Sequence, residues 1–178
     1  MKQLTYSMVV VLFLALVGCS GSGVKPSVEL GDQFKVGSVL LTISQHIEPN
    51  ITYHTEAELQ ELLRKKIKVQ LAKQGLLSQQ SVANYLTVQV AYQRKFLNEQ
   101  SPHPSGALAY PQYSYEIKVM NGATELGRVS KKNREFKGRF IMNIDVIEGR
   151  LKKKSDEIVF IDGLAKEIVR SVYDLKKG

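Results

Sequence analysis

The fold of this chain is decided by one stretch, TEAELQELLRKKIKVQLAKQGL, which runs from Thr55 to Leu76. Thr55 followed by Glu58 is a capping-box pattern, because the hydroxyl accepts from an orphan N–H while the carboxylate reaches back. Apolar residues then recur at helical spacing, at Leu59, Leu62, Leu63, Ile67 and Leu71. Gly75 is a typical helix stop, with Leu76 as its hydrophobic contact. The stretch therefore predicts an amphipathic helix over about residues 56–74.

Several stretches around this helix alternate apolar and polar residues with a period of two, which is the pattern of half-buried strands. Asn121-Gly122 lies between two of them and favours a hairpin turn, since both residues accept a positive φ. The predicted strands are residues 34–47, 85–96, 113–119, 126–129 and 140–146.

A second helix is predicted over about residues 156–175. Ser155 can cap it, and Asp156 and Glu157 suit the positive end of its dipole. Its apolar stripe consists of Ile158, Ile161, Leu164, Ala165, Ile168, Val172 and Leu175. The order of elements predicts an α+β fold, a two-layer sandwich in which two amphipathic helices cover a mostly antiparallel sheet of four to five strands.

The composition limits the chemistry that the chain can support. With 178 residues and 43% hydrophobic content, the chain suits one globular domain plus a targeting segment. A single cysteine excludes an internal disulfide and any Cys-based zinc or iron–sulfur centre. Three histidines leave few imidazole ligands, so no metal site and no cofactor are expected.

The N-terminus has the anatomy of an export signal. Lys2 is followed by an unbroken apolar run over residues 8–17, and Gly18 supplies a small residue for cleavage. Ten helical residues rise about 15 Å, which is half of the roughly 30 Å hydrocarbon core of a bilayer. A permanent membrane span is therefore not expected from this segment.

Leu16-Val17-Gly18-Cys19 resembles the lipobox of bacterial lipoproteins. The resemblance implies that the thiol of Cys19 receives a diacylglycerol, that the signal is cut before Cys19, and that the freed amine is acylated with a fatty acid such as palmitate. A free cysteine beside an ordinary signal peptide is the alternative. Ser20, in place of the Asp that retains proteobacterial lipoproteins at the inner membrane, resembles an outer-membrane sorting signal.

These features predict three parts of the chain. Residues 1–18 form the lipoprotein signal peptide, residues 19–33 carry the lipidated cysteine and a flexible tether, and residues 34–178 form a single periplasmic domain. The order of elements also resembles that of small periplasmic lipoproteins such as the lipopolysaccharide-assembly lipoprotein LptE, and that of the N-terminal domain of TolB-like proteins.

The chain carries no signature of an enzyme. It contains no Gly-x-Ser-x-Gly elbow, no His-Glu-x-x-His pair and no phosphate-binding glycine loop, so a non-enzymatic role is expected. Asp32 and Asp145 are carboxylates that only the fold can bring together. Residues 97–112 are predicted to form a long loop, either functional or a mobile crossover. Its candidate functional residues are Pro102, His103, Pro104 and Tyr110.

Positive charge is concentrated between Lys131 and Lys154, where nine Lys and Arg residues stand against three Asp and Glu residues. An exported lipoprotein does not meet nucleic acid, so the expected partner is an anionic envelope component; a merely solvated face is the alternative. The candidate anion-binding residues are Lys131, Lys132, Arg134, Lys137, Arg139, Lys152, Lys153 and Lys154.

The sequence thus predicts an outer-membrane lipoprotein that faces the periplasm and binds or helps to assemble another envelope component. Its expected partners are the membrane, through the N-terminal lipid, and an anionic component or protein complex of the envelope. A structural accessory subunit of a secretion or transport complex is the main alternative. A periplasmic hydrolase whose site is assembled across the fold is a third.

Overall fold

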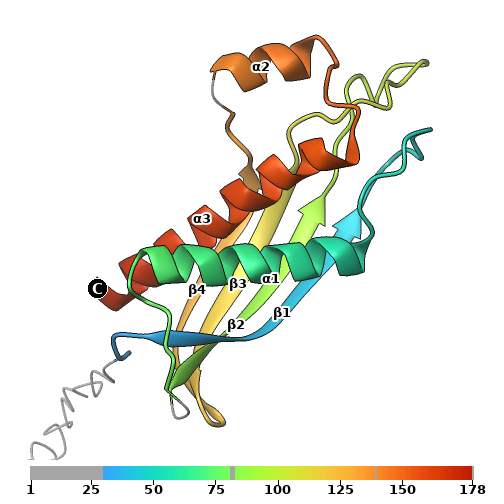
Figure 1. Cartoon of the computed structure of the whole chain (residues 1–178). Coiled ribbons are helices and arrows are strands. Elements are labelled where there is room, and N and C mark those ends of the chain that lie inside the picture. The colour runs from blue at the N-terminus through green and yellow to red at the C-terminus, as the bar shows by residue number, and fades with distance from the viewer. Residues whose placement is uncertain (1–29, 81–82, 139, 178) are drawn as a thin grey trace, which may run out of the picture.

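A computed structural model describes residues 30–80, 83–138 and 140–177. Two long helices cover one face of a four-stranded sheet, and a short third helix lies beyond one end of it (Figure 1). The predicted α+β sandwich is confirmed. The elements are β1 (Phe34–Ser44), α1 (Glu56–Lys73), β2 (Asn84–Gln93), β3 (Gln112–Asn121), β4 (Thr124–Glu135), α2 (Phe140–Ile147), a 3-10 turn (Lys154–Asp156) and α3 (Glu157–Lys177).

The strands follow their chain order, β1-β2-β3-β4, across the sheet. β1 and β2 are parallel, because α1 carries the chain back between them, whereas the pairs β2–β3 and β3–β4 are antiparallel. α1 and α3 pack against each other and against the sheet, and the main hydrophobic core fills the space between the two layers.

The ends of α1 follow the sequence prediction. The Thr55 hydroxyl accepts from the Glu58 N–H at 3.3 Å, and the Glu58 carboxylate accepts from the Thr55 N–H at 2.8 Å. At the other end Gly75 takes a positive φ of 68°. The N–H groups of Leu76 and Gly75 donate to the carbonyls of Leu71 and Ala72, which is a Schellman motif.

The apolar faces of the strands are also confirmed. Alternate residues of β1, β2 and β3 point under the helices and are buried, while their neighbours face outward, because successive side chains of a strand point to opposite faces. The buried residues that the alternation predicts include Val39, Leu41, Leu86, Val88, Val90, Tyr92, Tyr113, Tyr115, Ile117 and Val119.

The strand predicted over residues 140–146 is wrong: this segment is helix α2. Phe140, Met142 and Val146 fit a period of two, but Ile141 and Ile147 are also apolar, and a short apolar run satisfies either period. Gly149, with a φ of 64°, ends the helix. The N–H groups of Arg150 and Gly149 donate to the carbonyls of Asp145 and Val146, a second Schellman motif.

Two local details differ from the predictions. The β3–β4 turn is centred on Gly122 and Ala123, because Asn121 still pairs with Thr124, and only Gly122 has a positive φ. Ser155 lies within the 3-10 turn and does not cap α3.

The outer edge of β1 is partly occupied. At its start, the Phe34 N–H donates to the Leu76 carbonyl and the Ser78 N–H donates to the Phe34 carbonyl. Further along, the N–H groups of Leu41 and Ile43 donate to the side chains of Gln60 and Glu56 on α1, at 3.2 and 2.9 Å.

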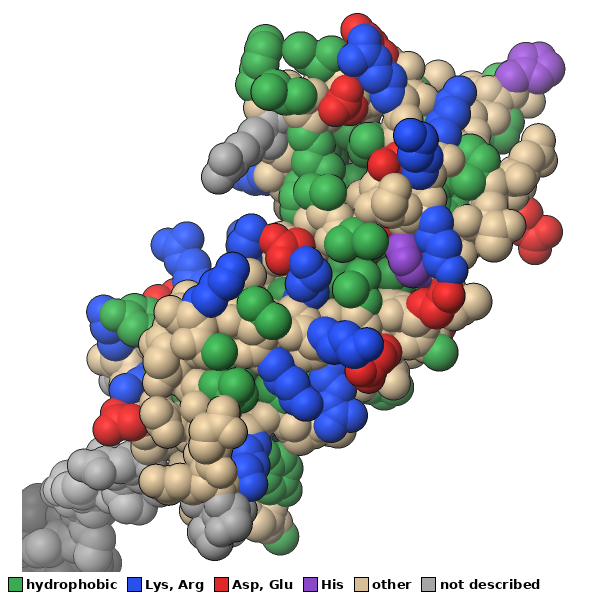
Figure 2. Space-filling model, in the orientation of Figure 1, with side chains coloured by type: hydrophobic (Ala, Val, Ile, Leu, Met, Phe, Trp, Pro, Cys, Tyr) green, Lys and Arg blue, Asp and Glu red, His purple; other side chains and the backbone are tan. Residues whose placement is uncertain are grey.

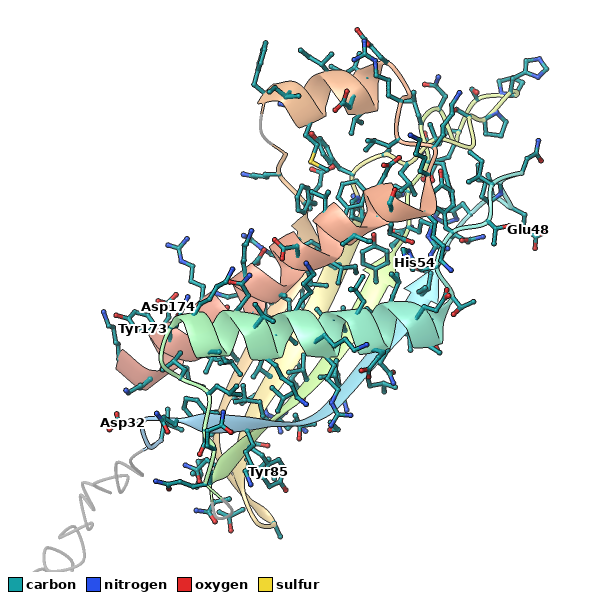
Figure 3. All side chains as sticks on the ribbon, in the orientation of Figure 1. Asp32, Glu48, His54, Tyr85, Tyr173 and Asp174 are labelled. Atoms are coloured by element: carbon teal, nitrogen blue, oxygen red, sulfur yellow. The ribbon has the colours of Figure 1, made fainter. Side chains whose placement is uncertain are left out.

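The start of α3 is fixed by a buried carboxylate. Glu157 is fully buried and accepts from the Arg94 guanidinium at 2.7 and 3.2 Å. The His54 N–H and its ring Nδ1 lie 3.3 and 3.2 Å from the same carboxylate. The other Arg94 donors reach the Gln45 side chain and the His54 carbonyl. Figure 3 marks His54 at this end of α3.

A charge introduced into the interface between the helices and the sheet should prevent folding. Leu63 and Ile168 are both fully buried, so Leu63→Asp or Ile168→Asp places an unpaired carboxylate in the core. Such a change costs several kcal/mol against a total stability of about 5–15 kcal/mol. Val69→Asp is the matched control, because Val69 lies on α1 but is 47% exposed. Thermal melts should show a lost transition for the first two variants and a retained one for the control; unchanged melts for all three would contradict the helix faces.

Candidate functional site

α2 is held away from the sheet by a small aromatic cluster. Phe136, just after β4, packs edge-on against Phe160 of α3, with their ring centroids 5.1 Å apart. Its ring lies so close to Gly163 that a Cβ there would stand 2.3 Å from it. Tyr110 covers Gly138 in the same way and donates a hydrogen bond to Asn143 on α2. Because Gly163 and Gly138 have no side chains, the segment between β4 and α2 packs closely against α3 and Tyr110.

A cleft of about 1110 Å³ opens between α2 and α3. Its apolar lining comes from Phe136, Phe140, Ile141, Met142, Leu151 and Val159. Its acidic lining comes from Glu135, Asp145, Asp156, Asp162 and Glu167. Among the described side chains, only Glu135 of this acidic group makes no hydrogen bond or ion pair. The cleft therefore holds its carboxylates mainly in structural contacts.

α2 exposes three large apolar side chains, and two of them, Phe140 and Ile141, also line the cleft. Phe140, Ile141 and Ile147 are 78%, 74% and 75% exposed, and Val146 is the one residue of the helix that is buried. Figure 2 shows hydrophobic side chains over α2, at one tip of the molecule. Exposed apolar side chains that gather in one place mark interaction sites, so this surface is the leading candidate for one.

The candidate anion-binding residues divide into two groups, one before α2 and one after it. Lys131, Lys132 and Arg134 lie on β4 and Lys137 follows it, whereas Lys152, Lys153 and Lys154 lie between α2 and α3. Arg139 falls outside the described residues. Along the chain, α2 therefore divides the basic run into two groups.

Ion pairs occupy several of these cations. Lys154 contacts Glu58 of α1 at 2.6 Å, Arg134 contacts Glu167 of α3 at 3.2 Å, and Arg150 contacts both Asp145 and Glu148. Within the described part of the chain, the candidates that are exposed and make no ion pair are Lys131, Lys132, Lys137, Lys152 and Lys153.

The loop over residues 97–112 splits into two parts. Pro102, His103 and Pro104 are exposed at its tip, but Tyr110 packs back against Phe136 and Phe160. Ala107 and Leu108 are buried, and the Leu97 N–H donates to the Ala107 carbonyl at 2.9 Å. The four candidate residues therefore do not form one site, and the second half of the loop supports α2.

The carboxylates considered for hydrolysis are not brought together. Asp32 pairs with Lys176 at the C-terminal end of α3, whereas Asp145 pairs with Arg150 next to α2. No group of three metal-ligating side chains occurs within the described residues, and none of the described helices is long and apolar enough to cross a bilayer. Cys19 and the lipobox lie outside the described residues.

Tyr113 and Tyr115 of β3, which the strand pattern predicts only as core residues, hydrogen-bond to polar side chains of α3, and Tyr113 also lines the cleft. Tyr113 donates to the Glu167 carboxylate at 2.5 Å, and Tyr115 contacts both Glu167 and Ser171. Burial, together with the nearby Glu167 charge, raises the pKa of Tyr115 to about 12, and it also raises the pKa of Tyr113. The pair therefore acts as hydrogen-bond donors to Glu167 and holds β3 against α3.

These raised pKa values predict alkaline unfolding. A tyrosine in the unfolded chain titrates near pH 10, whereas Tyr115 in the folded protein keeps its proton until about pH 12. The stabilisation that the protonated Tyr115 contributes is therefore fully present below pH 10 and is lost as the pH rises toward about 12. Burial also raises the pKa of Tyr53 to about 12. Tyrosinate absorbance should show a late step that coincides with the loss of the circular-dichroism signal, and Tyr115→Phe should shrink that step by one tyrosine. Complete titration near pH 10 in a still-folded protein would contradict this.

Comparisons with known proteins do not assign the chain to a family. No protein-family model and no curated protein matches it. A minor lipoprotein from Acinetobacter baumannii is similar in structure, with a TM-score of 0.38 and 17% identity over 74% of this chain and 90% of that one. A rare lipoprotein B from Shewanella oneidensis gives a TM-score of 0.23 and 15% identity over 77% and 98%. Both likenesses are too loose to define a family.

Proposed function

We propose that this chain is a lipid-anchored envelope protein, attached through Cys19 to the periplasmic face of the outer membrane. It acts as a non-enzymatic factor that binds another envelope component or helps to assemble it. The lipobox supports the anchor, since the only cysteine of the chain directly follows the apolar run and a small residue. The exposed apolar face of α2 carries the binding role, because a folded domain rarely leaves such a surface without a function.

A role as an accessory subunit of a secretion or transport complex is the second candidate. It is favoured by β4, which is an outermost strand of the described sheet and has mostly exposed side chains. A free strand edge is a ready template for pairing with another chain. Under this alternative, a neighbouring subunit covers β4 and α2 together.

The anchor is tested by Cys19→Ala. Each buried CH₂ of an acyl chain contributes about 0.8 kcal/mol, so several chains on one residue hold a protein firmly on a leaflet. Cell fractionation followed by a salt wash should move the variant from the membrane pellet to the soluble fraction. Its thermal melt should stay unchanged, because every described element begins at or after Phe34. Variant protein that remains in the washed pellet would contradict the lipid anchor.

The anion contact is tested with the lysines that the structure leaves unpaired. Near an anionic surface each lysine contributes about 1 kcal/mol, within a Debye length of roughly 8 Å. Replacing Lys152 and Lys153 with Gln should therefore weaken binding of the soluble chain, residues 20–178, to lipopolysaccharide or anionic vesicles by up to about thirtyfold. Lys154 is left in place because it pairs with Glu58.

Replacing Lys68 and Lys73 on α1 with Gln is the matched control, because it removes the same charge from a different surface. High salt should reproduce the effect of the Lys152 and Lys153 variant. Equal binding by both variants and by the parent, at all salt concentrations, would mean that these lysines form only a solvated face.

A further inference from the structure

We propose that α2 is an interfacial helix, whose outward apolar side enters the boundary between headgroups and acyl chains of an anionic leaflet. This inference deepens the proposed function, because it rests on an envelope location and names the partner of the α2 surface. It differs from a purely electrostatic contact, since the apolar side chains and not the lysines would supply most of the binding.

The helical period sorts the α2 side chains onto two faces. At about 100° per residue, Met142 and Val146 lie on one side and Phe140, Ile144 and Ile147 lie within about 60° of one another on the other side. Val146 is buried, Phe140 and Ile147 are about three-quarters exposed, and Ile144 between them is partly exposed. Ile141, which is 74% exposed, lies about 100° from Phe140 and next to Asp145. The side that carries Phe140, Ile144 and Ile147 is therefore apolar, which suits insertion into a soft apolar medium.

The charges around α2 complement an anionic surface. Lys137 precedes the helix, and Lys152 and Lys153 follow it; all three are exposed, and none makes an ion pair among the described residues. Glu135 is also exposed and unpaired among them, so three unpaired cations stand against one unpaired carboxylate. Asp145, the one charged residue on α2 itself, is paired with Arg150. An apolar face flanked by unpaired cations is the arrangement that interfacial helices use on anionic lipids.

The length of the chain before the domain allows α2 and a lipid on Cys19 to reach one leaflet together. The described chain begins at Leu30, next to the C-terminal end of α3, where Asp32 pairs with Lys176. Figure 3 marks Asp32 at the end of the domain opposite His54 and the start of α3. α3 has 21 residues and is about 30 Å long, while the ten residues between Cys19 and Leu30 span at most about 35 Å. Both contacts are therefore compatible when α3 lies along the membrane.

The test uses the soluble chain, residues 20–178, and a single fluorescent reporter. Because the chain contains no Trp, Phe140→Trp places one indole at the proposed insertion point. With vesicles of phosphatidylglycerol and phosphatidylethanolamine, its emission should shift to the blue and be quenched by brominated acyl chains. Tyr173→Trp on α3, far from α2, is the matched reporter and should show neither effect.

Affinity measurements separate insertion from charge. Ile147→Asp should weaken vesicle binding about tenfold or more in high salt, where repulsion between the new carboxylate and the lipid is screened and the loss reports the missing apolar side chain. The variant in which Gln replaces Lys152 and Lys153 should lose only the salt-sensitive part of its affinity for the vesicles. Because Ile147 is exposed, the melting temperature of Ile147→Asp should match that of the parent; vesicle binding by this variant equal to that of the parent overturns the inference.

The remaining outcomes discriminate between the two proposals. Salt-sensitive vesicle binding without quenching of the indole at position 140 overturns insertion and leaves the anion contact intact. Concentration-dependent dimerisation that Ile147→Asp abolishes overturns it in favour of a second copy. A photocrosslinker at position 147 that labels a protein but no lipid in intact envelopes overturns it in favour of a protein partner, and the binding role under the proposed function then stands.

Discussion

The arrangement of the whole α2 end of the molecule depends on one buried ion pair, between Arg94 and Glu157. These residues are 63 positions apart, and they join the end of β2 to the first turn of α3. The Arg94 guanidinium donates hydrogen bonds to the Glu157 carboxylate, to the Gln45 side chain and to the His54 carbonyl. All three partners belong to the protein itself. Removing one partner of a buried pair costs about 3–5 kcal/mol, because it strands a charge in a medium that cannot solvate it. The start of α3, the segment before α1 and the cleft are thereby fixed to one another.

Most of the fold followed from the sequence because its long elements carry several independent signals that agree. α1 has a capping box, an apolar stripe and a glycine stop, and each of these alone predicts the same helix. α2 has too few residues for its period to be read, so alternation and helical spacing fitted equally well. Gly149 is compatible with a helix stop, but a glycine of positive φ also ends a strand, as Gly122 does after β3, so it could not decide between the two.

The candidate site was less predictable, because its geometry depends on contacts between distant segments. The sequence located the basic run, but not that Glu58 and Glu167, on two different helices, would pair with Lys154 and Arg134. Nor could it show that Tyr110 would leave the tip of its loop and support α2. Some of the candidate functional residues proved to be packed or ion-paired, and others proved to be exposed and unpaired. Neither property can be derived from the spacing of charges along the sequence alone.

The partly occupied edge of β1 has a consequence for how this protein behaves at high concentration. Backbone from residues 76–78 pairs with the start of β1, and side chains of α1 take two further N–H groups of that strand. Head-to-tail polymerisation through strand pairing needs two open edges on every molecule. Another strand would have to displace these contacts to pair along β1, so among the described strands β4 is the easier edge to extend and growth into open-ended β-fibres is disfavoured.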